Sequence, residues 1–375
     1  MDRIYSLEAV RGMLALWVVV GHTILHSGYS SNNIGPFKLL AVPALAVDVF
    51  IILSGFVIFF LLDNQRTSYG QFLVKRWFRL APLLMAVMLV SALTLNVQLG
   101  VIDASPFPSH AVTEDAKLHL DSISYLPQHL LAHATMLHGM VPNSWLPSSQ
   151  FAIVGQAWSI SLEWQFYLIA PLVFGLIAAR RYGWLCAVIV AVCALRSLNF
   201  ENDGFIIRQA QFFIIGILSY YGWKFSRAIT IAPGAVDALA LSAIALVYLL
   251  LTRTASLIIW IAVMAVIVAE RRNAFSKAQK LASTVLQWPV MQWLGKISYS
   301  IYLVHMLVFY AVQYAVMALY PTIAKPAFLA VMLVGVVGGT IALSMFSYRF
   351  VEMPGIQAGR RVGAWFGAQG APRFS

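Results

Sequence analysis

Hydrophobic runs long enough to cross a bilayer alternate with short polar segments along almost the whole chain. A membrane-spanning helix needs about 20 mainly apolar residues. The segments that meet or approach this length are 8–27, 38–62, 77–100, 151–179, 183–199, 205–222, 233–251, 255–269, 290–319 and 326–350. The pattern predicts an all-α, polytopic bundle of about ten transmembrane helices, with the first run retained as a signal anchor because it lacks a convincing cleavage site.

Lysine and arginine residues between the runs orient this bundle, because cytoplasmic loops are enriched in them. With the N terminus in the cytoplasm, the inner segments hold Arg3, Arg66, Lys75, Arg76, Arg79, Arg180, Arg181, Lys224, Arg227, Arg271, Arg272, Lys277 and Lys280. The outer segments hold fewer basic residues: Lys38, Lys117, Arg196, Arg208, Arg253 and Lys325. We therefore expect cytoplasmic termini, a transmembrane domain over 1–353 and a disordered cytoplasmic tail over 354–375.

Composition supports a membrane protein and argues against a nucleic-acid-binding one. Of the 375 residues, 61% are hydrophobic and only 10% are charged, and the mean hydropathy is +0.80. The net charge of +11 comes from the short clusters between apolar runs, so it is explained by membrane topology. Cys186 and Cys193 lie in one apolar run, which is typical of small packing residues and not of a disulfide or metal pair.

The segment 101–150 is the one long stretch expected outside the membrane, on the non-cytoplasmic side. It holds most of the chain's histidines and several acidic residues, among them Asp103, Glu114, Asp115 and Asp121. We expect a lid or a substrate platform there. His129, His133 and His138 begin with a spacing that would place two metal ligands on one helix face, but no further metal motif accompanies them, so no metal is expected.

Two ionisable residues, Arg11 and His22, interrupt the first apolar run. Eleven helical residues turn through about 1100°, so the two side chains share one face about 16 Å apart along the axis. A charged residue inside a membrane is costly and usually faces a protein interior or an aqueous cavity. This pair is therefore the strongest functional signal in the chain.

Three more titratable residues are expected at a depth similar to that of His22, on other helices: Asp48, Glu163 and His305. A histidine beside a carboxylate can act as a general base near neutral pH. On the cytoplasmic side, Lys75, Arg76 and Arg79 could clamp phosphate groups together with Arg11. Each of these side chains also has a structural interpretation, in topology for the basic cluster and in packing or hydrogen bonding for the other three.

These residues fall in strings that resemble the acyltransferase family 3 integral membrane proteins, and the resemblance runs nearly end to end. Its elements are Arg11 with His22, the stretch from Asp48 to Ser54-Gly55-Phe56, the pair Arg76 and Arg79, the string Trp158, Ser161, Glu163, Gln165, Phe166 and Tyr167, the string Ser298, Tyr299, Tyr302, Leu303 and His305, and Glu352-Met353-Pro354. Glu8 and Trp164 depart mildly from the family pattern.

The resemblance implies an O-acyltransferase that moves an acyl group, most simply acetyl, from cytoplasmic acyl-CoA to a hydroxyl of a cell-envelope or secreted glycan or glycolipid. His22 would be the general base, oriented by Glu163 or Asp48. Arg11, Lys75, Arg76 and Arg79 would hold the phosphates of acetyl-CoA or another acyl-CoA, and Ser54 would help to bind the developing oxyanion. A covalent acyl-His22 intermediate is the competing scheme.

The acceptor contacts are expected at aromatic and polar residues of the outer side, which are Trp145, Trp158, Tyr167, Arg196, Arg208 and His305. The expected partners are acyl-CoA, a carbohydrate or glycolipid such as lipopolysaccharide, and the lipid of the cell inner membrane; self-association into a homo-oligomer stays open. Two other classes of function stay open. One is a proton-coupled transporter or flippase that uses Arg11, His22, Asp48 and Glu163 as a relay. The other is a non-catalytic sensor that binds through 101–150.

Overall fold

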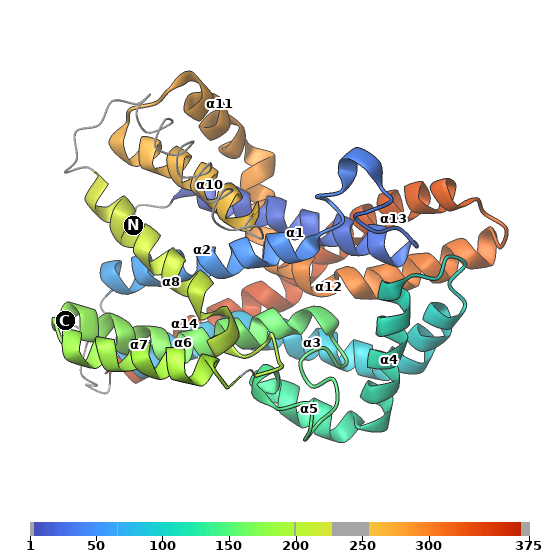
Figure 1. The fold of residues 1–375 in the computed structure, drawn as a ribbon, viewed down its shortest axis with the longest axis horizontal. Helices are drawn as coiled ribbons and strands as arrows, with labels where there is room; N and C mark the ends of the chain where they lie inside the picture. Colours follow the sequence, from blue (N-terminus) through green and yellow to red (C-terminus); the bar gives the residue numbers. More distant parts are fainter. Residues whose placement is uncertain (1–3, 66, 199, 227–254, 369–375) are drawn as a thin grey trace. The chain divides into compact units, whose positions relative to one another are not determined.

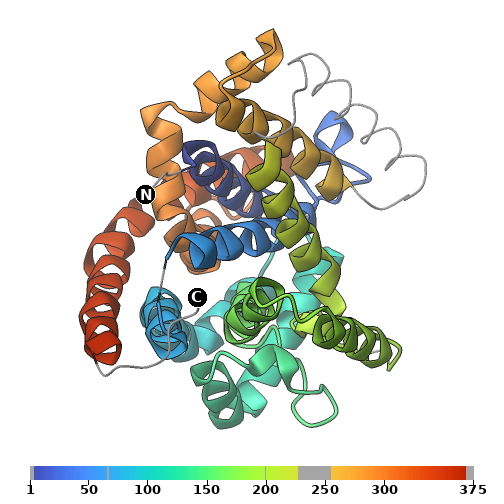
Figure 2. The ribbon, with the colours of Figure 1, turned by 90° about the vertical axis from the view of Figure 1, so that its left-hand side faces the viewer.

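The computed structural model describes residues 4–65, 67–198, 200–226 and 255–368. All regular elements in these ranges are helices, as Figure 1 and Figure 2 show. The longer ones are α1 (Tyr5–His26), α2 (Pro43–Asn64), α3 (Tyr69–Asp103), α4 (His110–Ser124), α5 (Leu126–Ala134), α6 (Trp158–Ala178), α7 (Tyr182–Arg196), α8 (Ile206–Phe225), α10 (Ala255–Arg272), α11 (Lys277–Leu286), α12 (Pro289–Leu319), α13 (Lys325–Ser347) and α14 (Met353–Ala368). The all-α prediction is confirmed for the described residues.

Six helical segments within the described ranges are long and apolar enough to cross a membrane. They are Tyr5–His26, Pro43–Asn64, Tyr69–Asp103, Gly155–Ala178, Pro289–Leu319 and Lys325–Phe366. The helix α7 is apolar but shorter, and α8 and α10 occupy two further predicted segments. The predicted segment 233–251 lies outside the described residues. The protein is therefore a multi-pass membrane protein, and the full count of about ten spans stays a prediction.

One compact unit consists of residues 1–18, 42–64 and 211–299. Within it, α2 crosses α8 at very short range. A Cβ atom added to Gly55 would lie 2.4 Å from the carbonyl oxygen of Phe213, and one added to Gly216 would lie 2.0 Å from that of Ile52. Both positions require glycine because the backbones touch. The glycine of the Ser54-Gly55-Phe56 string is thus a packing residue.

The other unit consists of residues 19–41, 65–210 and 300–375. In it, the 101–150 segment is not an open loop. The helix α3 continues to Asp103, and α4 and α5 then pack against it as a pair of short helices (Figure 1). Ser109 caps α4 by accepting a hydrogen bond from the backbone N–H of Val112. This capped helix faces the cavity described below.

The prediction of a disordered tail after residue 353 is wrong as far as Ala368. The chain passes from α13 through a π-helical turn, η5 (Tyr348–Glu352), directly into α14. Glycines recur every four residues in α14, at positions 355, 359 and 363, and each faces α3 at close range. This spacing gives the helix one smooth face, so a stretch rich in glycine and alanine folds by packing where its composition indicates disorder.

Candidate active site

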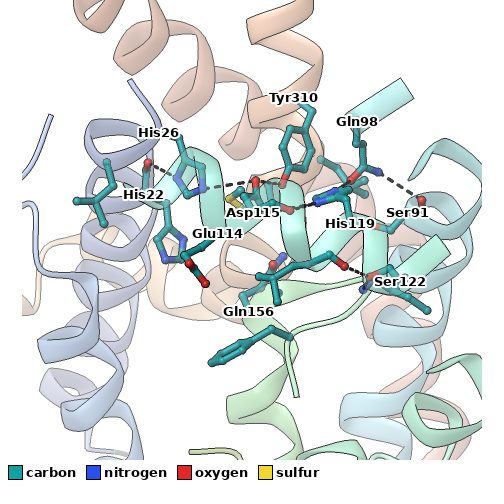
Figure 3. Close-up of a pocket in the computed structure, with 18 of the residues that line it drawn as sticks. His22, His26, Ser91, Gln98, Glu114, Asp115, His119, Ser122, Gln156 and Tyr310 are labelled. Carbon is teal, nitrogen blue, oxygen red and sulfur yellow. Dashed lines mark hydrogen bonds and ion pairs between the residues drawn. The ribbon is translucent and has the colours of Figure 1, made fainter. Parts of the chain in front are cut away.

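A cavity of about 280 Å³ lies within the second unit, where α1, α3, α4 and α12 meet the segment that precedes α6 (Figure 3). The volume is close to the lower end of small-molecule sites, about 300 Å³. Its polar lining residues are His22, His26, Ser91, Gln98, Glu114, Asp115, His119, Ser122, Gln156 and Tyr310. Phe151 and Trp158 contribute aromatic rings to the same wall. The site thus combines a polar lining with an aromatic surface.

Hydrogen bonds determine which nitrogen of His22 is free to act as a base. His305 Nδ1 lies 2.7 Å from the carbonyl oxygen of Tyr302, which can only accept, so this nitrogen carries the proton. In a neutral ring, His305 Nε2 is then an acceptor, and it lies 2.8 Å from His22 Nδ1. His22 Nδ1 therefore donates, and the lone pair of a neutral His22 is on Nε2. The chain of bonds from Tyr302 through His305 thus fixes the tautomer of a neutral His22.

The Tyr302 side chain ties this arrangement to the start of α6. Its hydroxyl donates to the carbonyl oxygen of Gln156 at 2.8 Å and lies 2.8 Å from Ser159 Oγ. The side chain of Gln156 donates through Nε2 to the carbonyl oxygen of Leu303, while its buried Oε1 has no hydrogen-bond partner in the described residues. Gln156 lines the cavity, but solvent does not reach this oxygen.

The helix α4 inserts a carboxylate, Asp115, beside the same cavity. Tyr310 Oη donates to Asp115 Oδ2 at 2.7 Å, and His26 Nε2 lies 3.5 Å from the same oxygen. His119 Nδ1 lies 3.5 Å from Asp115 Oδ1, and His119 Nε2 lies 3.0 Å from Gln98 Oε1. Figure 3 shows these groups as one continuous polar chain along the wall. The short helix α4 thus completes the site.

The charge state of Asp115 follows from these neighbours. Burial opposes its ionisation, but the hydrogen bonds with His26 and Tyr310 and the electrostatic attraction of His26 and His119 outweigh burial and hold the pKa of Asp115 below its usual value. Asp115 is therefore an ionised carboxylate at neutral pH. Sequence reasoning did not single out His26, Asp115, His119 or Tyr310 as a set. One signal was available, because His26 follows His22 by four residues and so shares its helix face.

Of the predicted catalytic partners, Glu163 accepts a hydrogen bond from Tyr167 Oη one helical turn later in α6. The group at hydrogen-bonding distance from His22 Nδ1 is His305. Asp48 lies half-buried in α2, in the other unit, as does Ser54. Catalytic roles for Glu163, Asp48 and Ser54 stay predictions.

The three arginines predicted to bind the acyl donor differ in their surroundings. Arg79 forms an ion pair with the fully buried carboxylate of Glu352, whose second oxygen accepts a hydrogen bond from Ser300 at 2.7 Å. Arg76 forms no such pair among the described residues, and its guanidinium carbon lies 5.8 Å from the ring centroids of both Phe72 and Tyr167. Arg11 is part of α1 in the other unit, where its Nε atom is buried.

Some of the predicted acceptor-binding residues line the cavity and others do not. Trp158 lines the cavity. Trp145 is 81% exposed, Arg196 is exposed at the end of α7, and Arg208 pairs with Asp203 at 3.0 Å. These three residues do not line the cavity, so the structure brings only part of the predicted set together.

The histidines of the 129–138 stretch are buried and packed together. The rings of His133 and His138 stack with centroids 3.8 Å apart and planes only 5° from parallel. A metal ion bound by histidine lies in the plane of the imidazole ring. Two rings stacked in parallel therefore cannot both direct a nitrogen at one metal ion. Among the described residues, no group of three or more His, Cys, Asp or Glu side chains is arranged to hold a metal ion. Burial lowers the pKa of His133 to about 4 and that of His138 well below its usual value.

Comparison with known proteins assigns this chain to a family. The model of the acyltransferase 3 family, an acyltransferase domain, matches residues 4–345. The chain belongs to the acyltransferase 3 family. The resemblance drawn from the sequence is thereby confirmed, and the six apolar helices are those of a multi-pass membrane protein.

A curated relative within this class is similar over part of its length. "Acyltransferase MdmB" of Streptomyces mycarofaciens is 28% identical over 202 residues, which are 50% of this chain and 44% of that protein. The match therefore spans less than half of that relative. No solved structure matches the chain significantly. Family membership supplies the class of reaction, and the geometry of the cavity supplies the candidate residues.

Proposed function

We propose that this protein transfers an acyl group, most simply acetyl, from cytoplasmic acyl-CoA to a hydroxyl of a carbohydrate or glycolipid at the cell inner membrane. The acceptor would belong to the cell envelope or to a secreted glycan. The observation that carries the proposal is the chain from Tyr302 through His305, which leaves the Nε2 lone pair of His22 as the base in a cavity. A base held in this way suits the deprotonation of a hydroxyl.

In the proposed reaction, His22 Nε2 removes the proton of the acceptor hydroxyl as its oxygen attacks the thioester carbonyl carbon. The new C–O bond forms, and the C–S bond breaks as the tetrahedral intermediate collapses. The imidazolium of His22 then gives its proton to the departing thiolate, so an ester and free CoA thiol result and no other reactant is needed. His305 stabilises the imidazolium by accepting from Nδ1.

The polar wall opposite His22 suits a hydroxylated acceptor. Gln98, Ser122 and Gln156 line the cavity, and their polar side chains would hydrogen-bond to hydroxyl groups of the acceptor. Asp115 would hold α4 over the cavity and present a carboxylate edge. A sugar ring also has an apolar face, for which Trp158 and Phe151 offer aromatic surface. Acceptor contacts at Trp145, Arg196 and Arg208 are proposed for the outer part of a longer glycan.

The competing scheme has a covalent acyl-His22 intermediate, in which the same Nε2 lone pair attacks the thioester. Rapid-quench labelling with radioactive acetyl-CoA in the absence of acceptor separates the two schemes. Label retained on wild-type protein and lost from His22→Ala supports the covalent route, and no retained label supports direct transfer.

The proposed function is tested by the release of free thiol from acetyl-CoA by the purified protein, with glycans extracted from cells that lack the gene as acceptors. His22→Ala should lower acceptor-dependent thiol release by about 10²- to 10⁴-fold, the usual contribution of a general base. His110→Ala is the matched control, because His110 is an exposed histidine at the start of α4. Wild-type thiol release by His22→Ala would contradict the catalytic assignment.

A further inference from the structure

A cluster of three basic residues forms where α14 packs against the beginning of α3. Lys75 and Arg76 come from α3, and Arg360 comes from α14. The two helices touch closely, since a Cβ atom added to Gly359 would lie 2.5 Å from Phe78 Cβ and one added to Gly363 would lie 3.2 Å from Lys75 Cε. This contact places Arg360, the residue next to Gly359, at the same end of α3 as Lys75.

The three charges have no ion-pairing carboxylate among the residues that the structure describes. Arg76 and Arg360 both repel the ammonium group of Lys75. The Nε atom of Arg76 is buried and has no hydrogen-bond partner within the described ranges. Like charges in contact oppose folding, and a buried donor without a partner adds to that cost. The repulsion between the three charges is relieved when an anion binds beside them.

Arg79 differs from this cluster although it lies only one turn further along α3. Its charge is neutralised by the buried carboxylate of Glu352, which the π-helical turn before α14 directs into the protein. Arg79 therefore anchors the start of α14, and α14 in turn carries Arg360 to the cluster.

We infer that Lys75, Arg76 and Arg360 form a phosphate-binding site and that Arg360 is a further donor-binding residue. The inference rests on the proposed function for the identity of the donor. Guanidinium groups bind phosphate oxygens in pairs, and an added ammonium suits the multiple charges of a nucleotide such as CoA. The phosphate of an anionic lipid has the same chemistry, and the experiment must separate the two sources.

The experiment measures Kd for CoA and for dephospho-CoA, which lacks one phosphate, with the full chain in nanodiscs of phosphatidylcholine. Arg360→Ala should weaken CoA binding by about tenfold, the loss expected for one charge-assisted contact. Arg361→Ala is the matched control, because the next residue of the same exposed helix turn carries the same charge and points about 100° away. Wild-type protein should bind dephospho-CoA more weakly than CoA. Arg360→Ala should lower the affinity for dephospho-CoA by a smaller factor than the affinity for CoA.

Three results would overturn the inference, and they differ from one another. Equal CoA affinity in Arg360→Ala, Arg361→Ala and wild type would remove Arg360 from the donor site. Unchanged CoA affinity with reduced retention of phosphatidylglycerol in mixed nanodiscs would assign the cluster to lipid. Wild-type protein that binds no CoA would contradict the proposed donor itself. Size-exclusion profiles and thermal unfolding of both variants verify that each is folded.

Discussion

Replacement of His305 tests whether His22 is prepared as a base by the hydrogen bond at its other nitrogen. His305→Phe keeps a planar ring in the buried site but removes the acceptor that lies 2.8 Å from His22 Nδ1. His22 would then lose the partner that favours a proton on Nδ1. The competing tautomer places the proton on Nε2, where it blocks the base.

The expected size of the effect follows from one buried hydrogen bond. A buried donor left without a partner costs about 1–3 kcal/mol, which corresponds to about 5- to 150-fold in an equilibrium. We therefore expect His305→Phe to lower kcat for acceptor-dependent thiol release by about 10- to 100-fold. Loss of the base itself in His22→Ala costs more, about 10²- to 10⁴-fold. The KM for acyl-CoA should not change.

His305→Gln separates the hydrogen bond from the shape of the site. Its side-chain oxygen can accept from His22 Nδ1 in place of the ring nitrogen, so kcat should recover to within about fivefold of wild type. The reasoning is refuted if His305→Phe retains wild-type kcat. It is also refuted if His305→Gln is as slow as His305→Phe while both unfold at the wild-type temperature, because packing and not the acceptor would then matter.

The remaining predictions concern the short helices α4 and α5. Asp115→Asn removes the charge that faces His26 and weakens the hydrogen bond from Tyr310. The helix α4 should then open more often, and hydrogen exchange of the backbone amides over 110–124 should rise by about 5- to 150-fold. Unchanged exchange would show that Asp115 does not hold the helix. The pKa of His133 in the folded protein, about 4, lies below its ordinary value of 6.5. Between these two pH values the unfolded chain therefore binds the proton more readily than the folded protein does. The stability due to neutral His133 is full above pH 6.5 and is lost as the pH falls toward 4, by up to roughly 3 kcal/mol. The unfolding temperature should fall from about pH 7 to about pH 5, and less steeply in His133→Gln; equal slopes would contradict this.

Several features of the fold were predictable because they depend on local pattern. Apolar runs interrupted by basic clusters predict membrane helices, and the segments containing His22 and His305 are indeed such helices. The helical tail was not predictable in this way. Glycine is unfavourable in an isolated helix, and α14 is stable only because glycines 355, 359 and 363 allow close contact with α3. This close contact depends on both helices, so it cannot be predicted from the sequence of α14 alone.

The candidate site also has features that could be predicted from the sequence and features that depend on tertiary contacts. The sequence alone shows that Arg11 and His22 interrupt an apolar helix, because residue type and helical spacing are local properties. The pairing of His22 with His305, the approach of Asp115 to the cavity from α4 and the ion pair of Arg79 with Glu352 became visible only in the folded chain. Hydrogen bonds and ion pairs join residues far apart in the chain, and their strength depends on distances of a few tenths of an ångström. Residue types and spacing do not contain those distances.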